Sequence, residues 1–130
     1  MPQVRALVYA PDRQLLEWID RELGQVAVIV QVAISVRQVV RALVDDPPPR
    51  AQLLIADIAN MSAIDVLHLH QIRDRGWFGA ILAIGRVSSD LSKSLRVDKV
   101  VRPCGTNALR NTVEAIGLDR PTVRIARLDG

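Results

Sequence analysis

Five short apolar segments recur along the chain, and each is followed by a segment in which apolar residues repeat with helical spacing. A run of about four to eight apolar residues is typical of a buried strand, whereas apolar residues at i, i+3, i+4 and i+7 indicate a helix that packs on one side. Strands that alternate with helices predict a parallel sheet, because a helical crossover lets the next strand run in the same direction. The predicted strands are residues 4–9, 26–33, 52–57, 79–84 and 99–102.

Capping residues and a helix breaker set limits on the helices between these strands. Asp12, Ser35 and Thr106 are each followed by apolar residues at helical spacing, so we expect them at helix N-caps. Pro47–Pro49 ends the second helix, because proline lacks the amide donor and clashes with the preceding turn. Gly117 is placed to end the last helix. The predicted helices are residues 12–23, 35–44, 62–73, 88–96 and 106–116.

The order of these elements predicts an α/β fold. The strands are apolar on both faces, so we expect helices to cover the sheet on both sides. Right-handed crossovers then favour a flavodoxin-like (βα)5 three-layer sandwich, with a parallel five-stranded sheet of order 2-1-3-4-5. A chain of 130 residues has room for one core, which we place in residues 1–117. Residues 118–130 are then a C-terminal tail, an added edge strand or a linker to a following domain.

Composition narrows the class of protein. A single cysteine, Cys104, excludes an internal disulfide and fits a reducing compartment, so we expect a cytoplasmic protein. No apolar run reaches the roughly 18 residues of a membrane span, and a strand-like segment at 4–9 argues against a signal peptide, so we expect no membrane association. The net charge is only +3, and two Trp, one Tyr and one Phe are too few for a base-stacking surface. We therefore expect no nucleic-acid binding by this domain.

A ligand site in such a sheet lies at the carboxyl ends of the strands, near the point where the strand order reverses. Asp57 ends the third predicted strand, Asp12 follows the first, and Arg102 ends the fifth. Residues 9–13 contain no glycine, so they do not form a phosphate-binding loop of the kind that nucleotide enzymes use. No Ser-His-Asp or Cys-His set is apparent either. We therefore expect that the protein is not an enzyme.

Residues 4–117 resemble the receiver domains of response regulators in two-component signalling. The resemblance is carried by the (βα)5 order, by LLIAD at 53–57, in which a lone Asp ends a strand, and by VVRP at 100–103, in which a basic residue precedes proline. It implies a pocket where an acidic pair and Asp57 hold Mg2+ and Asp57 accepts a phosphoryl group from a histidine kinase. It also implies a Ser or Thr and a Lys that contact the phosphoryl oxygens, and an aromatic residue on the fifth strand that rotates when the domain is phosphorylated.

Most of these positions carry other residue types in this chain. Asp57 keeps the phosphoacceptor position. A carboxylate attacks phosphorus poorly unless a metal and cations neutralise the phosphoryl oxygens. We therefore predict a pseudo-receiver, with phosphoacceptor chemistry weakened or lost and with weak Mg2+ binding or none, for which Asp12 and Asp57 are weak candidate ligands. The remaining positions fall on Ala10 and Pro11 for the acidic pair, Gly85 (or Ile84, if the alignment shifts by one residue) for the hydroxyl, Arg102 for the lysine and Lys99 for the aromatic residue.

Two interpretations of Asp57 remain open. In one, it accepts a phosphoryl group within a phosphorelay, and the chain is the N-terminal part of a transcriptional regulator. In the other, which we prefer, it is a relic that either accepts hydrogen bonds from the loop that follows it or pairs with Arg102. Of these two contacts we favour the pair, because the planar guanidinium suits a carboxylate. Asp12 likewise is either a residual metal ligand or only the cap of the first helix.

The rim of the same pocket carries three further candidate residues. The resemblance implies that Pro103 follows a cis peptide bond. Gly85 either meets a backbone requirement of a turn or opens the pocket to a small ligand. Cys104 is either a small apolar filler or a redox group, and we favour the filler.

Four other side chains invite a functional interpretation that we do not favour. His68 and His70 are two residues apart on a helix and point about 200° apart, so they cannot chelate one ion. Leu67 and Trp77 are interpreted as scattered exposed apolar residues, which are common on protein surfaces.

The region from helix 88–96 through strand 99–102 to helix 106–116 is the predicted partner-binding face. Receiver domains use this face for dimers and for docking of targets, as the resemblance implies. In this chain it is basic, so we expect an acidic protein partner of a signalling pathway, or a second copy of the chain. The residues assigned to it are Leu91, Leu95, Lys99 and Arg110.

Overall fold

The computed structural model describes residues 4–24, 26 and 28–116, so Gly117 and the predicted tail at 118–130 lie outside the described residues. A helix at residues 108–116 follows the last strand. A short π-helical segment, Arg41–Asp45, extends α2, and a 3-10 turn, Ile58–Asn60, follows β3. The labelled elements are β1 (Val4–Tyr9), α1 (Arg13–Leu23), β2 (Val28–Ala33), α2 (Val36–Val40), β3 (Leu53–Ala56), α3 (Ala63–Asp74), β4 (Ala80–Ile84), α4 (Ser89–Leu95) and β5 (Lys99–Val101).

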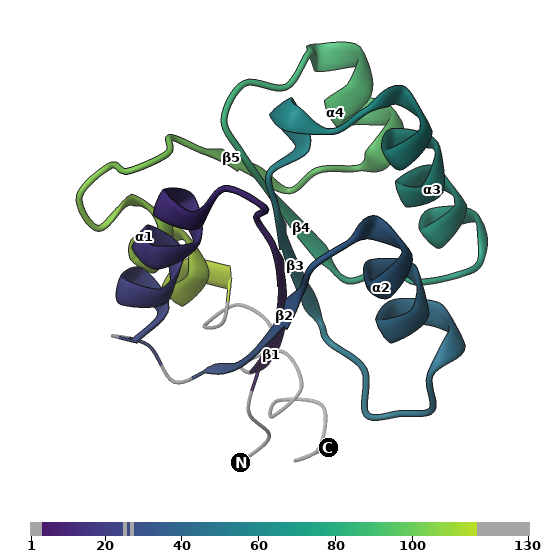
Figure 1. The fold of residues 1–130 in the computed structure, drawn as a ribbon, viewed down its shortest axis with the longest axis horizontal. Coiled ribbons are helices and arrows are strands. Elements are labelled where there is room, and N and C mark those ends of the chain that lie inside the picture. The colour runs from purple at the N-terminus through teal and green to yellow at the C-terminus, as the bar shows by residue number, and fades with distance from the viewer. Residues whose placement is uncertain (1–3, 25, 27, 117–130) are drawn as a thin grey trace, which may run out of the picture.

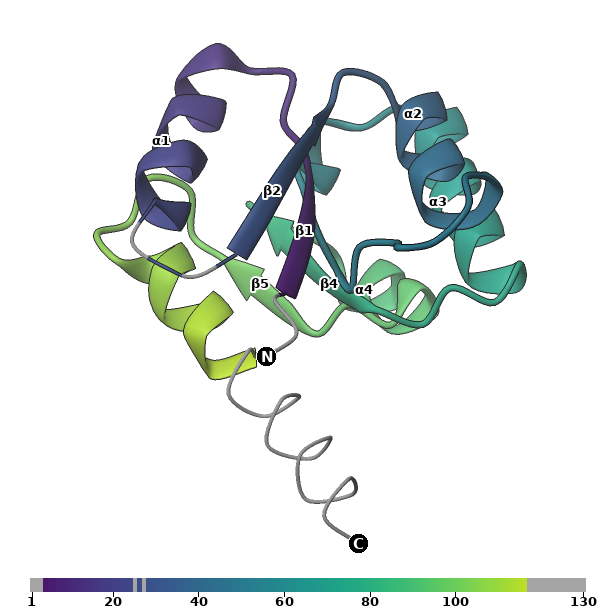
Figure 2. The same cartoon turned by 90° about the horizontal axis from the view of Figure 1, so that it is seen from below.

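The five strands form one parallel sheet in the order β2-β1-β3-β4-β5, which confirms the predicted topology. In Figure 1, α1 and helix 108–116 lie on one side of the sheet, and α2, α3 and α4 lie on the other. Figure 2 shows the same three layers from below. The carboxyl ends of β1, β3 and β4 therefore meet at one edge of the sheet, which is where the candidate site lies.

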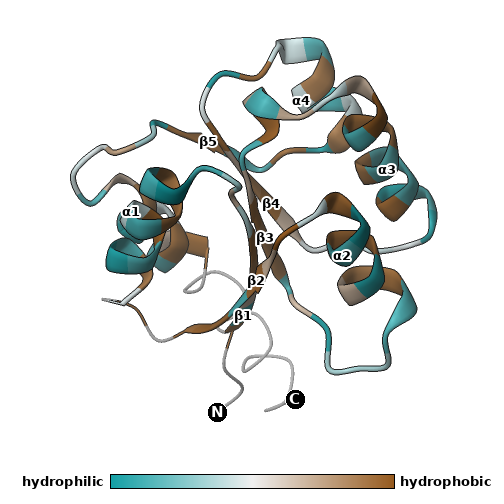
Figure 3. Cartoon of the chain, viewed as in Figure 1, coloured by the Kyte–Doolittle hydropathy of each residue, from teal (hydrophilic) through white to brown (hydrophobic). Residues whose placement is uncertain are grey.

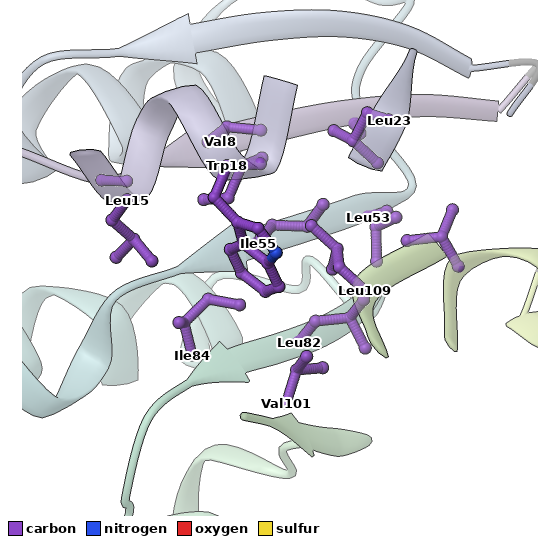
Figure 4. Packing of buried hydrophobic residues seen from close by; sticks show 14 of the residues in the cluster. Val8, Leu15, Trp18, Leu23, Leu53, Ile55, Leu82, Ile84, Val101 and Leu109 are labelled. Atoms are coloured by element: carbon purple, nitrogen blue, oxygen red, sulfur yellow. The ribbon is translucent and has the colours of Figure 1, made fainter. Parts of the chain in front are cut away.

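Each face of the sheet carries its own hydrophobic cluster. Leu53 and Ile55 belong to the cluster under α1, whereas Leu54 and Ala56 belong to the cluster under α2 and α3. This alternation follows from the two-residue repeat of a strand, which sends successive side chains to opposite faces. Figure 3 shows the strands mainly in the hydrophobic colour, and Figure 4 shows Trp18 of α1 packed among the residues of the first cluster.

Helix caps were predicted well where the cap is local. The Asp12 carboxylate accepts from the Leu15 N–H at 3.1 Å, and the Ser35 hydroxyl accepts from the Gln38 N–H at 3.2 Å. The cap predicted at Thr106 is wrong, because the last helix begins at residue 108. There the Glu22 carboxylate of α1 accepts from the first helical N–H groups, at 3.1 Å from Leu109 and 3.2 Å from Arg110. A side chain distant in sequence therefore caps this helix.

The second strand is less covered than predicted. Ile29, Val30 and Val32 have exposed fractions of 38%, 40% and 46%, although we expected helices over both faces. The reason is that β2 is an edge strand, whose described strand partner is β1 alone.

Trp77 is more buried than we predicted. Its indole N–H donates to the Ala51 carbonyl at 2.9 Å, so its assignment as an exposed residue is wrong. Leu67 is exposed, as predicted.

Among the described residues, no helix is long and apolar enough to cross a membrane.

Candidate functional site

A pocket of about 220 Å³ opens at the carboxyl ends of β1, β3 and β4. The structure brings four of the predicted site residues to it, together with Cys104, and places Ala10, Pro11 and Arg102 elsewhere. No described residue that lines this pocket is basic. The lining residues are Asp12, Gln14, Leu15, Asp57, Ala59, Asn60, Ile84, Gly85, Pro103 and Cys104.

Asp57 accepts hydrogen bonds from the loop that follows it, which is one of the two contacts that we considered for a relic. The side chain lies directly after β3 and is only 3% exposed, and its backbone N–H donates to the Tyr9 carbonyl at 2.9 Å. The turn Ile58–Asn60 then brings the Asn60 amide back onto the carboxylate. The Asn60 Nδ2 donates to both Asp57 oxygens, at 3.1 Å and 2.9 Å. Both oxygens that would meet a metal or a phosphorus atom are therefore engaged.

The Asp57–Arg102 ion pair that we predicted is wrong. Among the described residues, Asp57 forms no salt bridge, and the exposed Arg102 lines a different hollow beside β5. The physical reason is that a donor closer in sequence is available. Asn60 is three residues from Asp57, and its amide already donates hydrogen bonds to both carboxylate oxygens. An Asn or Ser shortly after a buried Asp is a sequence signal for such a local bond, and it would have identified Asn60.

The oxygen ligands at this pocket are few. Asp12 lines it, but one carboxylate oxygen accepts from the Leu15 N–H as the cap of α1, which confirms its interpretation as a cap. Ala10 is buried, Pro11 is exposed, and neither carries a side-chain oxygen. No group of three or more His, Cys, Asp or Glu among the described residues is arranged to hold a metal ion. Mg2+ takes hard oxygen ligands in near-octahedral geometry, and the two carboxylates that line this pocket already accept hydrogen bonds from the protein, so they fit this ion poorly.

Gly85 meets a backbone requirement. Its φ is +87°, a left-handed conformation that side chains other than glycine rarely adopt, and an added Cβ would lie 3.2 Å from the Ala59 Cβ. It also lines the pocket, and our second interpretation, that it opens the pocket to a small ligand, stays a prediction. A hydroxyl at this position, as a Ser or Thr would supply, is not compatible with that backbone without strain.

The turn after β5 differs from our expectation in two respects. Within residues 28–116 the cis peptide bond is Pro48–Pro49, so the cis bond predicted before Pro103 is wrong. The chain instead turns through Cys104 and Asn107, which have φ of 61° and 59°. Cys104 is exposed at the pocket rim, so it does not fill a gap in the core.

Tyr9 lies at the end of β1 behind the pocket. Burial raises the pKa of its phenol, and the negative charges of Asp65 and Asp57 raise that pKa further. The hydroxyl therefore stays protonated at neutral pH. Tyr9 was not among the residues predicted for the site, because its position in a strand indicates only a core role.

One of the two histidines, His70, links two helices. His70 Nε2 lies 2.9 Å from the Ser94 hydroxyl of α4, and Nδ1 lies 3.1 Å from the Val66 carbonyl one turn earlier in α3. Its ring therefore links α3 to α4. His68 is on the same helix, and it belongs to no described metal-ligand cluster.

The predicted partner-binding face is only partly exposed. Leu95 is completely buried in the second core cluster, and Leu91 packs against the same cluster, so the assignment of Leu95 to a contact surface is wrong. Their spacing of four residues on a short helix is that of core positions. Lys99 is exposed, and Arg110 lies 3.5 Å from the Glu114 carboxylate. An open hollow of about 850 Å³ lies beside β5 on this face, lined by Gly85, Arg86, Val87, Val100, Val101, Arg102 and Pro103.

Solved structures match the whole described fold, whereas no protein-family model and no curated protein matches the sequence. The chemotaxis protein CheY4 of Vibrio cholerae aligns with a TM-score of 0.71 over 88% of this chain and 98% of its own, at 16% identity. The receiver domain of Ssk1 from Saccharomyces cerevisiae, crystallised with the phosphotransfer protein Ypd1, aligns with a TM-score of 0.70 over 92% of both chains, at 14% identity.

A third match comes from a different biological setting. A pilus assembly-related protein of Burkholderia pseudomallei aligns with a TM-score of 0.71 over 89% of this chain and 90% of its own, at 18% identity. At such low identity the likeness concerns the fold rather than the chemistry of the site. The strand order β2-β1-β3-β4-β5 of the parallel sheet belongs to this shared fold. The chain therefore has the CheY-like fold of response-regulator receiver domains.

Proposed function

We propose that this chain is a receiver-like signalling module that acts by protein–protein contact, and that its phosphoacceptor chemistry is weakened or lost. It works in the cytoplasm and catalyses no reaction of its own. The observation that carries this proposal is the Asp57 carboxylate, whose two oxygens both accept from the Asn60 amide in a pocket without a basic lining residue.

The chemistry of phosphoryl transfer supports this proposal. Transfer to a carboxylate needs positive charge at the phosphoryl oxygens, from a metal ion and from basic or hydroxyl groups in the protein. Here Gly85 offers no hydroxyl, Arg102 lines another hollow, and Ala10 and Pro11 offer no metal ligand. A displaced Asn60 amide would leave Asp57 accessible, but it would not supply the missing charges. We propose that Mg2+ binds weakly or not at all.

Titration of the isotope-labelled protein with Mg2+, and then with Mg2+ plus beryllofluoride, tests the state of the pocket. Beryllofluoride mimics a phosphoryl group on aspartate and needs the same cations. We expect no saturable change in the amide NMR signals of Asp57, Gly85 and Cys104 at millimolar Mg2+, because Asp12 and Asp57, the carboxylates that line the pocket, already accept hydrogen bonds from the protein. The Asp57→Asn variant is the matched control and should give the same titration curves.

Saturable shifts in the wild type that disappear in Asp57→Asn would contradict the proposal. They would mean that Asp12 and Asp57 suffice as ligands. The alternative function would then apply, in which Asp57 accepts a phosphoryl group within a phosphorelay. The exposed position of the pocket, at the end of three strands, would allow a phosphodonor protein to approach it.

The hollow beside β5 is the proposed docking surface for a partner. Val100 on its floor is 51% exposed, and the exposed Arg86 and Arg102 flank it. Lys99 lies next to Val100 on the strand. An apolar floor between basic side chains suits a partner segment that combines apolar and acidic residues. We therefore propose an acidic protein of a signalling pathway as the partner.

Charge reversal tests this docking surface. Arg86→Glu combined with Arg102→Glu should abolish recovery of the partner from extracts of the source cells, because like charges would then face each other. The control combines Arg13→Glu with Arg37→Glu, two exposed arginines on α1 and α2, and should leave recovery unchanged. A protein recovered equally by wild type and by both variants would show that the hollow beside β5 is not the docking surface.

A further inference from the structure

The two edges of the sheet differ in how well they are protected. β5 is three residues long, begins with Lys99 and is followed by Arg102, and short charged edges discourage pairing with another chain. β2 is six residues long and has the sequence VIVQVA, without a charged residue, a proline or a glycine. Such an edge carries none of the usual protections and is a template for another strand.

The side chains of β2 add an apolar surface to that edge. Val28 packs on the α1 side and Ala33 on the α2 side, so Val30 and Val32 share the first face and Ile29 shares the second. Figures 1 and 2 show the outer edge of β2 between α1 and α2, with neither helix lying across it. Four of the eight large hydrophobic side chains exposed in the described part of the chain lie here: Ile29, Val30, Val32 and Ile34.

We propose that the outer edge of β2 pairs with β2 of a second copy of this chain, in antiparallel orientation about a two-fold axis, so that two sheets join into one. This surface is separate from the hollow beside β5, and the inference does not depend on the state of Asp57. A second copy is favoured as the occupant because of charge. Like charges directly opposite each other destabilise a strand pair, and an uncharged strand is the kind that can pair with itself.

The flank of the strand is self-complementary as well. A hollow of about 190 Å³ beside β2 is lined by one cation, Arg41, and one anion, Asp46, together with the amides of Gln31 and Gln38. A two-fold axis brings this hollow of each copy toward that of the other, so a cation and an anion are present on both sides of the interface. A surface made for a strongly charged partner would instead carry one sign of charge.

The size of the edge sets the expected affinity. A six-residue strand is about 20 Å long, so pairing along its edge covers much less than the roughly 800 Å² per partner of a stable interface. We therefore expect a weak dimer, with a dissociation constant on the order of 100 μM, whose formation depends on protein concentration. Such an equilibrium would respond to any factor that raises the local concentration of the chain.

Sedimentation equilibrium over a range of protein concentrations tests the proposal. The wild type should change from monomer to dimer, and Val32→Lys should weaken the dimer at least about tenfold, because the two-fold axis duplicates a new charge at the strand edge. Leu67→Lys is the matched control: it places a lysine at a similarly exposed apolar residue of α3, away from both edges of the sheet, and it should leave the dimer unchanged.

Amide hydrogen exchange of the wild type gives a second measurement that does not depend on a variant. Amides of β2 that do not bond to β1 should exchange fast at low concentration and become protected at high concentration. A monomer at all concentrations would overturn the proposal. A dimer that Val32→Lys leaves intact, and that Val100→Lys in the hollow beside β5 disrupts, would also overturn it, because the copies would then meet at the other edge of the sheet. Strong protection of the same amides in dilute monomer would also overturn it, because the edge would then be covered by another part of the same chain.

Discussion

Arg73→Leu should lower the free energy of unfolding by about 3–5 kcal/mol, a large share of the stability of a domain of this size. Arg73 lies in the last turn of α3 and is only 7% exposed. Its guanidinium donates to four backbone carbonyls, those of Leu95 at 2.8 Å, Gly79 at 2.8 Å, Arg96 at 2.9 Å and Trp77 at 3.2 Å.

The origin of these carbonyls explains the size of the effect. Two of them belong to Leu95 and Arg96 at the end of α4, where a helix leaves its last carbonyls without intrahelical partners. The guanidinium also lies 5.2 Å from the centre of the Trp77 ring, within range of a cation–π contact. Leucine fills similar space but donates no hydrogen bond, so these carbonyls would lose a buried partner.

Urea denaturation followed by circular dichroism measures the change. The matched control is Arg75→Leu, two residues further along, where the guanidinium pairs with Asp45 and both side chains are about half exposed. This surface pair should contribute less than about 1 kcal/mol. Equal losses in the two variants would mean that burial of Arg73 and its bonds to the end of α4 are not what holds α3, α4 and the loop before β4 together.

Much of the fold was predictable because its signals are local or follow from general rules. The apolar run at Val4–Tyr9 predicted the bounds of β1. The right-handed crossover rule left few possible strand orders, and the one we favoured among them is the one observed. The exposure of β2 was not predictable in the same way. An apolar run looks alike whether helices cover both its faces or the strand lies at an edge, and only the assembled sheet distinguishes the two cases.

The candidate site was predictable in its place but not in its contacts. Strand ends and topology located Asp57 and Gly85, because the carboxyl ends of parallel strands meet at one edge. The partner of Asp57 depends on a backbone turn, Ile58–Asn60, that the apolar pattern does not reveal. A general preference for Arg–carboxylate pairs favoured Arg102, although the nearest donor in the chain was Asn60.

The residues that cap helix ends were also not predictable where the cap comes from another element. Glu22 caps the last helix from α1, and Arg73 caps α4 from α3, so both caps bridge elements that are far apart in sequence. A basic residue in the last turn of a helix is ordinarily interpreted as solvated, and nothing in the sequence around Arg73 indicates burial. Tertiary caps of this kind require the positions of two elements at once.

Gly79→Ala should be the second most damaging of the substitutions considered, with a loss of about 3 kcal/mol in the free energy of unfolding, at the upper end of the usual cost of overpacking. An added Cβ would overlap the Trp77 ring and would lie 2.6 Å from the Gln52 carbonyl oxygen. That oxygen cannot move freely, because it accepts from the Ala80 N–H at 2.9 Å at the start of β4.

The Trp77 ring is equally constrained, since its N–H donates to Ala51 and its face lies against Arg73. Gly76→Ala is the matched control in the same loop. Gly76 has a φ of +97° and no atom within 4 Å of an added Cβ, so alanine there should cost about 1 kcal/mol through backbone strain alone. Thermal unfolding of both variants separates the cost of the overlap from the cost of the backbone conformation.

A double-mutant cycle with Trp77→Leu identifies the group that the new methyl meets. If the indole is the main obstacle, Gly79→Ala should cost at least about 1 kcal/mol less in the Trp77→Leu background than in the wild type, because the smaller side chain leaves room for the Cβ. If the cost were the same in both backgrounds, the contact with the Gln52 carbonyl would account for it. If Gly79→Ala lowered the free energy of unfolding no more than Gly76→Ala does, Gly79 would not be closely packed between the Trp77 ring and the Gln52 carbonyl that precedes β3. That result would contradict our explanation of how α3, the loop before β4 and β4 itself are joined.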